Sequence, residues 1–219
     1  MAVTGGGSGT EIASLIKGFA DIANASRKMT DKETELAKKH GFDPQEFIVG
    51  YDALAIFLHP NNPISSLSIS QLAEIFGEAG EITQWSQLNV HVPGCKEQKV
   101  IQVGRHNVSG TYAYLKNIVL NKKREYKLDT LEMHSSKDMV VLVKKSPCAI
   151  GYSGLAYATA RVKLVCISEN PKDPCVLPSI ESAIDGSYSL ARPLFMYTGE
   201  SPKGEVNNYI DWILSDEGQ

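Results

Sequence analysis

The chain has 219 residues, of which 42% are hydrophobic and 21% charged, so it can bury a substantial core as one large domain or two small ones. The formal net charge of -3 argues against nucleic acid or an anionic membrane as a partner held by bulk charge. No apolar run approaches the ~20 residues of a membrane span, and residues 1–9 lack the basic and apolar regions of a signal peptide. An anionic ligand must therefore be bound by local geometry.

The ends of several helices are marked in the sequence. Thr30 and Glu33 have the spacing of a capping box, and basic residues followed by a glycine close the same segment. Strand-like apolar runs alternate with such helices, which predicts an α/β fold. In chain order we expect helices after residue 10 and over 30–41, a strand over 47–58, a helix over 68–77, a strand over 100–104, a helix after residue 111, strands over 149–152, 163–167 and 190–197, and a helix over 205–214.

The four cysteines fit neither a zinc site nor a thioredoxin-like redox motif, because no CxxC occurs and no two histidines have ligand spacing. We expect no metal. An even count without metal spacing favours two disulfides in an oxidising compartment, the alternative being four buried thiols. Cys166 and Cys175 bracket a proline-rich loop, and Cys95 and Cys148 flank neighbouring strands. We therefore predict the pairs Cys166–Cys175 and Cys95–Cys148.

A Ser-Gly-Thr triplet precedes a helical pattern twice, at residues 8–10 and 109–111. A helix start offers unpaired N–H groups and the positive end of the dipole, while glycine permits close approach and hydroxyls add donors. One triplet alone is typical of an ordinary N-cap. Both together, with Arg105 four residues before the second, favour two helix starts that enclose a small tetrahedral anion. The first helical pattern comprises Ile12, Leu15, Ile16 and Phe19.

Catalytic motifs are missing from the sequence. The glycine run lacks the lysine of a P-loop and the acidic partner of a dinucleotide fingerprint, and neither GxSxG nor HExxH occurs. A phosphate-handling hydrolase would have to use Ser109 as nucleophile and His106 as base, although His106 is more typical of a surface loop. We expect no enzymatic activity and no cofactor.

Several motifs occur in order along nearly the whole chain. They are GGGSGTEI at 5–12, DIA at 21–23 leading to Ser26 and Arg27, YDALA at 51–55, NNP at 61–63, residues 72–76 leading to Trp85, RHNVSGT at 105–111 and AIGY at 149–152. Together they resemble the motifs of the periplasmic phosphate-binding proteins that serve ABC importers. The resemblance implies a two-lobed type II solute-binding fold with two crossing hinge strands, 47–58 and 190–197. Lobe one would be residues 1–54 plus 190–219, and lobe two residues 55–189.

The same resemblance implies the anion contacts. Ser26 and Arg27 stand where the best-known members place an aspartate that accepts the phosphate proton. An inward Arg27 would add a second cation and only donors, so that sulfate and phosphate would be separated poorly. A solvated Arg27, or Asp52 as substitute acceptor, would preserve the discrimination. The other implied contacts are Ser8, Gly9 and Thr10 in lobe one and Arg105, Ser109, Gly110 and Thr111 in lobe two.

The function implied by the resemblance is capture of inorganic phosphate, or a similar oxyanion, between two lobes for delivery to the permease of an ABC transporter. The protein would be a periplasmic or extracellular monomer without a nucleic-acid partner. An earlier strand and a Ser/Thr loop of the family have no counterpart here, so we expect a trimmed segment. The alternative is a binding-protein-like sensor or interaction module with a vestigial anion site.

Overall fold

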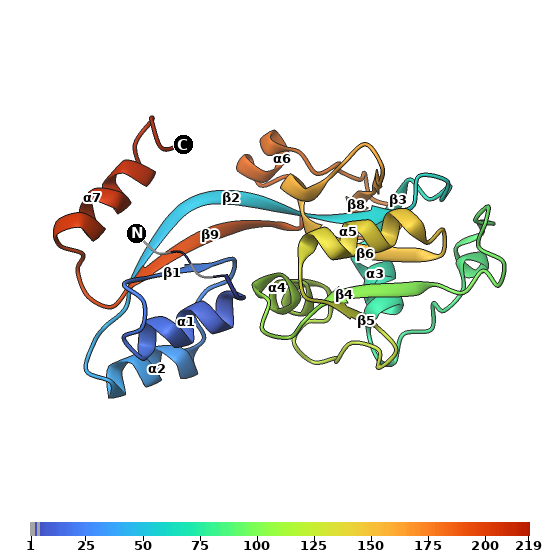
Figure 1. Cartoon of the computed structure of the whole chain (residues 1–219). Coiled ribbons are helices and arrows are strands. Elements are labelled where there is room, and N and C mark those ends of the chain that lie inside the picture. The colour runs from blue at the N-terminus through green and yellow to red at the C-terminus, as the bar shows by residue number, and fades with distance from the viewer. Residues whose placement is uncertain (1–2, 4) are drawn as a thin grey trace. The chain divides into compact units, whose positions relative to one another are not determined.

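The computed structural model describes residue 3 and residues 5–219. They form an α/β protein (Figure 1), as predicted, with two compact units. Unit 1 comprises Met1–Tyr51, Asn107–Gly110 and Arg192–Gln219, and unit 2 comprises Asp52–His106 and Thr111–Ala191. The chain thus passes between the units within β2 (Gln45–Leu58) and at the start of β9 (Ala191–Thr198), and the short segment 107–110 belongs with unit 1.

Unit 1 is built on the antiparallel pair β1–β9, in which Ile22 lies opposite Thr198. Helix α1 packs against β1 and α2 and contributes Ile12, Leu15 and Ile16 to the core of the unit. The elements are α1 (Ser8–Ile16), β1 (Ile22–Ala25), α2 (Asp31–Lys39), the first half of β2 (Gln45–Leu58), β9 (Ala191–Thr198) and α7 (Gly204–Ile213).

Unit 2 contains a sheet with the order β2-β6-β4-β5, and β7 pairs with β2. Strand β6 is antiparallel to β2, whereas β4 is parallel to both β6 and β5. Helix α5 lies against β6 and β4 (Figure 1), and β3 and β8 form a second, parallel sheet. The elements are β3 (Ser66–Ser68), α3 (Ile69–Phe76), β4 (Ile101–Arg105), α4 (Gly110–Val119), β5 (Leu131–Met133), α5 (Ser136–Lys145), β6 (Ala149–Gly154), β7 (Lys163–Leu164), β8 (Cys166–Ser168) and α6 (Ile180–Ile184), with short 3-10 helices at Trp85–Leu88 and Leu155–Tyr157.

The predicted helices over 30–41 and 68–77 are confirmed, and both begin with a capping box. Glu33 N–H donates to the Thr30 hydroxyl (3.3 Å), and Gln71 N–H donates to the Ser68 hydroxyl (3.1 Å). In each helix the side chain at the third position, Glu33 or Gln71, accepts a hydrogen bond from the backbone N–H of the cap residue. Because these signals are local, the sequence alone positions α2 and α3.

Two predictions are corrected. Residues 163–167 are not one strand: β7 pairs with β2, whereas β8 pairs with β3, so the run divides between two sheets. Phe19 is not on the buried face of the first helix but is 82% exposed. Helix α1 ends at Ile16, and Gly18, with φ of +72°, turns the chain before Phe19.

Both predicted disulfides are present, and they engage all four cysteines. The Cys95–Cys148 bridge lies beside Trp85, a fully buried side chain whose indole N–H donates to the Cys148 carbonyl (3.1 Å). The other tryptophan, Trp212 of α7 in unit 1, is 46% exposed. In the described part of the chain, no helix has the length and apolar character needed to cross a membrane.

Loss of the Cys95–Cys148 bridge is expected to destabilise the protein more than loss of the Cys166–Cys175 bridge. The first closes 53 residues and the second 9. Loop entropy then predicts losses of about 4 and about 2.5 kcal/mol, respectively. Denaturant unfolding of Cys95→Ala/Cys148→Ala and of Cys166→Ala/Cys175→Ala measures both losses. A larger loss for the short bridge would contradict the prediction.

Candidate functional site

Three predicted site residues, Ser8, Ser26 and Gly110, lie together in unit 1. Ser26 N–H donates to the Ser8 hydroxyl (3.0 Å), and the two hydroxyl oxygens are 3.4 Å apart. A Cβ atom added at Gly110 would overlap both hydroxyls, so the backbone of the second triplet lies directly against them. The Ser8 hydroxyl therefore does not cap its own helix, whose N-cap is Gly7. It contributes instead to a small polar cluster, Ser8–Ser26–Gly110.

The backbone N–H groups of the first triplet are engaged. Gly9 N–H donates to the Val108 carbonyl (3.2 Å), and Thr10 N–H donates to the Gly7 carbonyl (2.8 Å). The segment that carries Val108 is thereby hydrogen-bonded to the first turn of α1. Both N–H groups thus donate to backbone carbonyls within unit 1. Gly9 lies close to the Val108 backbone, and Thr10 lies in the first turn of α1.

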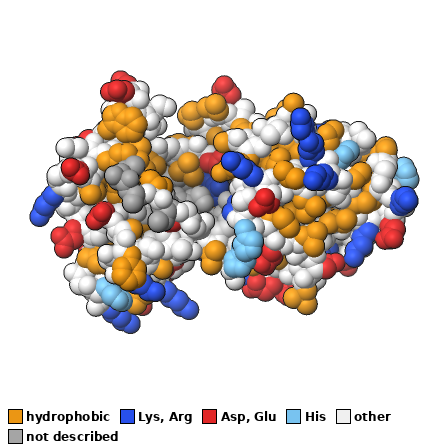
Figure 2. Space-filling model, viewed as in Figure 1, with side chains coloured by type: hydrophobic (Ala, Val, Ile, Leu, Met, Phe, Trp, Pro, Cys, Tyr) orange, Lys and Arg blue, Asp and Glu red, His pale blue; other side chains and the backbone are white. Residues whose placement is uncertain are grey.

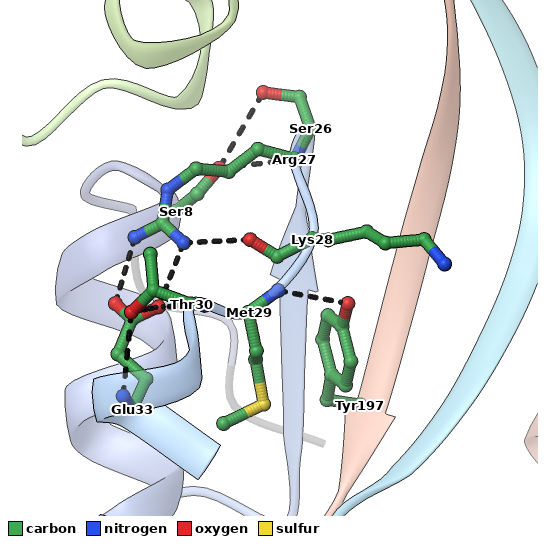
Figure 3. Close-up of polar contacts among 8 residues, drawn as sticks. All are labelled: Ser8, Ser26, Arg27, Lys28, Met29, Thr30, Glu33 and Tyr197. Atoms are coloured by element: carbon green, nitrogen blue, oxygen red, sulfur yellow. Dashed lines mark hydrogen bonds and ion pairs between the residues drawn. The ribbon is translucent and has the colours of Figure 1, made fainter. Parts of the chain in front are cut away.

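The guanidinium of Arg27 is held by Glu33 in a two-pronged ion pair (Figure 3). Nη2 donates to Oε1 (2.7 Å), and Nη1 donates to Oε2 (2.8 Å) and to the Lys28 carbonyl (2.8 Å). It also lies over the first turn of α1, since a Cβ at Gly9 would be 3.6 Å from Nη2. Arg27 is therefore neither an inward cation without a counter-charge nor a fully solvated one, and a carboxylate compensates its charge.

The same carboxylate caps α2, because Oε2 of Glu33 also accepts from the backbone N–H (2.8 Å) and the hydroxyl (3.0 Å) of Thr30. Burial of Glu33 raises its pKa, but the hydrogen bonds from Arg27 and Thr30 outweigh burial and hold the pKa below its usual value. Glu33 is therefore charged at neutral pH and links the end of β1 to the start of α2.

A buried cation near the cluster was missed by sequence reasoning. Arg192, on β9, is only 4% exposed, and its Nη1 donates to the Ser26 carbonyl (3.4 Å). No local motif marks this position, because Arg192 reaches Ser26 across 166 residues of sequence. Because buried arginines are rare, an arginine within an apolar strand is the one feature of the sequence that indicates a special role for Arg192.

In unit 2 the predicted anion-binding Arg105 ends strand β4. Its Nη1 donates to the Ser136 hydroxyl (2.6 Å), its Nη2 to the His134 carbonyl (2.9 Å) and its Nε to the Met133 carbonyl (3.3 Å). Its backbone N–H donates to the Tyr152 hydroxyl (3.3 Å). The guanidinium thus lies at the carboxyl end of a parallel strand, where α/β proteins commonly place ligands.

The remaining predicted residues differ in their surroundings. Ser109 and Thr111, which flank the start of α4, are 5% and 6% exposed. The His106 ring stacks on His134, with centroids 5.5 Å apart. Asp52, on β2, lies against Gly154, where an added Cβ would come within 2.9 Å of Oδ2.

A cavity of about 260 Å³ opens in unit 2 next to Arg105. Two of the lining side chains, Tyr126 and Tyr152, have stacked rings with centroids 6.2 Å apart, and burial raises the pKa of Tyr152 to about 12. The Thr130 hydroxyl, also in the cavity wall, is buried without a hydrogen-bond partner. The cavity is lined by Gly104, Arg105, Tyr112, Glu125, Tyr126, Lys127, Leu128, Thr130, Glu132 and Tyr152.

Charged side chains of both signs lie at the surface of the protein. Figure 2 shows both acidic and basic side chains on the face it presents, in keeping with the net charge of -3. Among the described residues no group of three or more His, Cys, Asp or Glu side chains could hold a metal ion. The hydroxyls and glycine backbone of unit 1, and the Arg105 guanidinium of unit 2, are each groups of a kind that binds oxyanions.

Comparison with known proteins gives consistent results. Residues 1–217 match the family model described as the PBP superfamily domain. The chain is 33% identical to the phosphate-binding protein PstS of Pseudomonas aeruginosa over 231 aligned residues, covering 100% of this chain and 71% of that protein.

Solved structures agree with the sequence relatives. One, described as a phosphate ABC transporter substrate-binding protein from Clostridium perfringens with bound phosphate, is 29% identical with a TM-score of 0.80 over 97% of this chain and 80% of that one. An ABC-type phosphate transport receptor from Vibrio cholerae is 27% identical with a TM-score of 0.74, covering 98% and 82% of the two chains.

Glu33→Gln is expected to destabilise the protein by about 1–2 kcal/mol at pH 7. The substitution removes the negative charge that pairs with Arg27 and one of the oxygens that accept from Arg27 and Thr30. The folded pKa of Glu33 is lowered from 4.5, so the wild-type advantage is complete above pH 4.5 and is lost as the pH falls through the folded value. Denaturant unfolding between pH 3 and 7 measures this. Glu35→Gln, at an exposed position of the same helix, is the control, and an equal loss in both variants would contradict the prediction.

Gly110→Ala is expected to lower stability by about 1–3 kcal/mol, because the new methyl group overlaps the Ser8 and Ser26 hydroxyls. Gly50→Ala is the matched control, since nothing lies within 4 Å of a Cβ at that position. Thermal unfolding of both variants compares them. Equal transition temperatures would show that the cluster tolerates a side chain at Gly110.

Proposed function

Because the chain belongs to the PBP superfamily and, within it, to the family of phosphate-binding proteins, we propose that it captures inorganic phosphate and delivers it to an ABC importer. The protein acts as a monomeric binding protein, not an enzyme, outside the cytoplasm. Its two disulfides suit an oxidising compartment. We assign unit 1 and unit 2 to the two lobes of the binding-protein fold.

The observation that carries the proposal is the convergence of Ser8, Ser26 and Gly110, which brings parts of both Ser-Gly-Thr triplets together. Arg105 supplies the charge that an anion requires, because its guanidinium donates in a fixed fork. The residues that we assign to the anion are Ser8, Gly9, Thr10, Ser26 and Gly110, together with Arg105, Ser109 and Thr111. Arg27 is assigned a supporting role, since Glu33 compensates its charge.

A hydrolase is less well supported than a binding protein. The His106 ring stacks on His134, and its backbone N–H donates to the Met133 carbonyl, so the surroundings of His106 are those of a strand-end loop. The names of the relatives also describe binding and transport. We therefore expect no turnover of phosphate esters.

Arg105→Ala is expected to weaken phosphate binding by on the order of 2–5 kcal/mol, or about 1.5 to 3.5 decades, because the anion loses its charged partner. Titration calorimetry of the wild type and the variant with phosphate measures the difference. Lys137→Ala, which removes an exposed cation next to Ser136 in the sequence, is the control. An unchanged isotherm in Arg105→Ala would refute the assignment of Arg105, and the absence of any phosphate isotherm in the wild type would favour the sensor or interaction module.

Sulfate is expected to compete with phosphate, because hydroxyl and guanidinium donors such as those assigned can donate to any tetrahedral dianion. Competition calorimetry with excess sulfate measures this. If phosphate binding is untouched, an acceptor for the phosphate proton is present. Asp52→Asn then tests whether that acceptor is Asp52, since the variant would admit sulfate.

A further inference from the structure

We propose that Ser136 is a positioning residue for Arg105, and that its hydroxyl strengthens phosphate binding by fixing the guanidinium before the anion arrives. The inference rests on the proposed function. It assigns to the start of α5 a role in anion affinity that neither triplet indicates.

The geometry begins with the sheet of unit 2. Strands β4 and β5 are parallel, and Arg105 at the end of β4 lies opposite Met133 at the end of β5. The chain that leaves β5 then passes the Arg105 side chain before entering α5. Within four residues it provides three acceptors, the carbonyls of Met133 and His134 and the hydroxyl of Ser136.

Three of the five N–H groups of a guanidinium are thus committed to one segment. Two of the acceptors are backbone carbonyls and would be supplied by any residue. The third is a side chain, and at 2.6 Å it makes the shortest of the three bonds. Ser136 is therefore a position at which substitution alters how firmly Arg105 is held.

The Ser136 hydroxyl is not needed to begin its own helix. The N-cap of α5 is Ser135, whose hydroxyl accepts from the Asp138 N–H (3.1 Å) and donates to the Asp138 carboxylate (2.6 Å). Ser136 is 8% exposed, so its hydroxyl is also largely withdrawn from water. Two adjacent serines thus divide two tasks: Ser135 caps the helix and Ser136 holds Arg105.

A free arginine side chain loses considerable rotamer entropy when a ligand fixes it. Holding the guanidinium beforehand removes part of that cost from binding. Loss of the Ser136 hydroxyl removes its bond to Nη1 and so adds part of that entropy cost to phosphate binding. The effect acts through Arg105 alone, and this separates it from a general loss of stability.

The test compares Ser136→Ala with Ser135→Ala by phosphate calorimetry and thermal unfolding of the full chain. Ser136→Ala is expected to bind phosphate about 2- to 10-fold more weakly, the cost of re-ordering one long side chain. Ser135→Ala is expected to lower the unfolding temperature through loss of the cap, with phosphate affinity unchanged. Equal or tighter phosphate binding by Ser136→Ala would overturn the proposal.

A double-mutant cycle shows whether Ser136 acts through Arg105. In the Arg105→Ala background, Ser136→Ala is expected to cause no further loss of phosphate affinity. A second loss as large as the first would overturn the positioning role. If Arg105→Ala binds phosphate as tightly as the wild type, the assignment of Arg105 in the proposed function is wrong. If Arg105→Ala binds phosphate weakly but Ser136→Ala binds it with wild-type affinity, only the present inference is wrong.

Discussion

The close packing of backbone against hydroxyl at Gly110 is the constraint on which the arrangement in unit 1 depends. With no Cβ at this position, the segment 107–110 reaches the hydroxyls of Ser8 and Ser26. That contact joins a segment from the middle of the chain to its first helix. It also explains why Ser8 faces Ser26 and leaves the cap of α1 to Gly7.

The arginines of the molecule differ in the kind of partner that holds them. Arg27 is paired with a carboxylate six residues away, which also caps the following helix, so that carboxylate compensates its charge. Arg105 donates to two backbone carbonyls and a hydroxyl of the segment that follows β5. The two arginines therefore differ in the groups that orient the guanidinium, a carboxylate for Arg27 and carbonyls with a hydroxyl for Arg105.

The parts of the fold that the sequence predicts are those that local chemistry determines. Thr30 and Ser68 sit in capping boxes that need no tertiary contact, and Cys166 and Cys175 are close enough in sequence to pair within one loop. The parts that it does not predict depend on distant neighbours. Whether residues 163–167 form one strand or two is decided by β2 and β3, and the Ser136 hydroxyl that accepts from Arg105 lies 31 residues away.

The two tryptophans give the two units different optical signals. The indole of Trp85 is enclosed in the core of unit 2, whereas Trp212 in unit 1 is in contact with water and stacks on Tyr209. Emission from the buried indole should lie at shorter wavelength than emission from the exposed one. The fluorescence spectrum during denaturation therefore separates the melting of the two units, and coincident transitions would indicate that they unfold as one cooperative system.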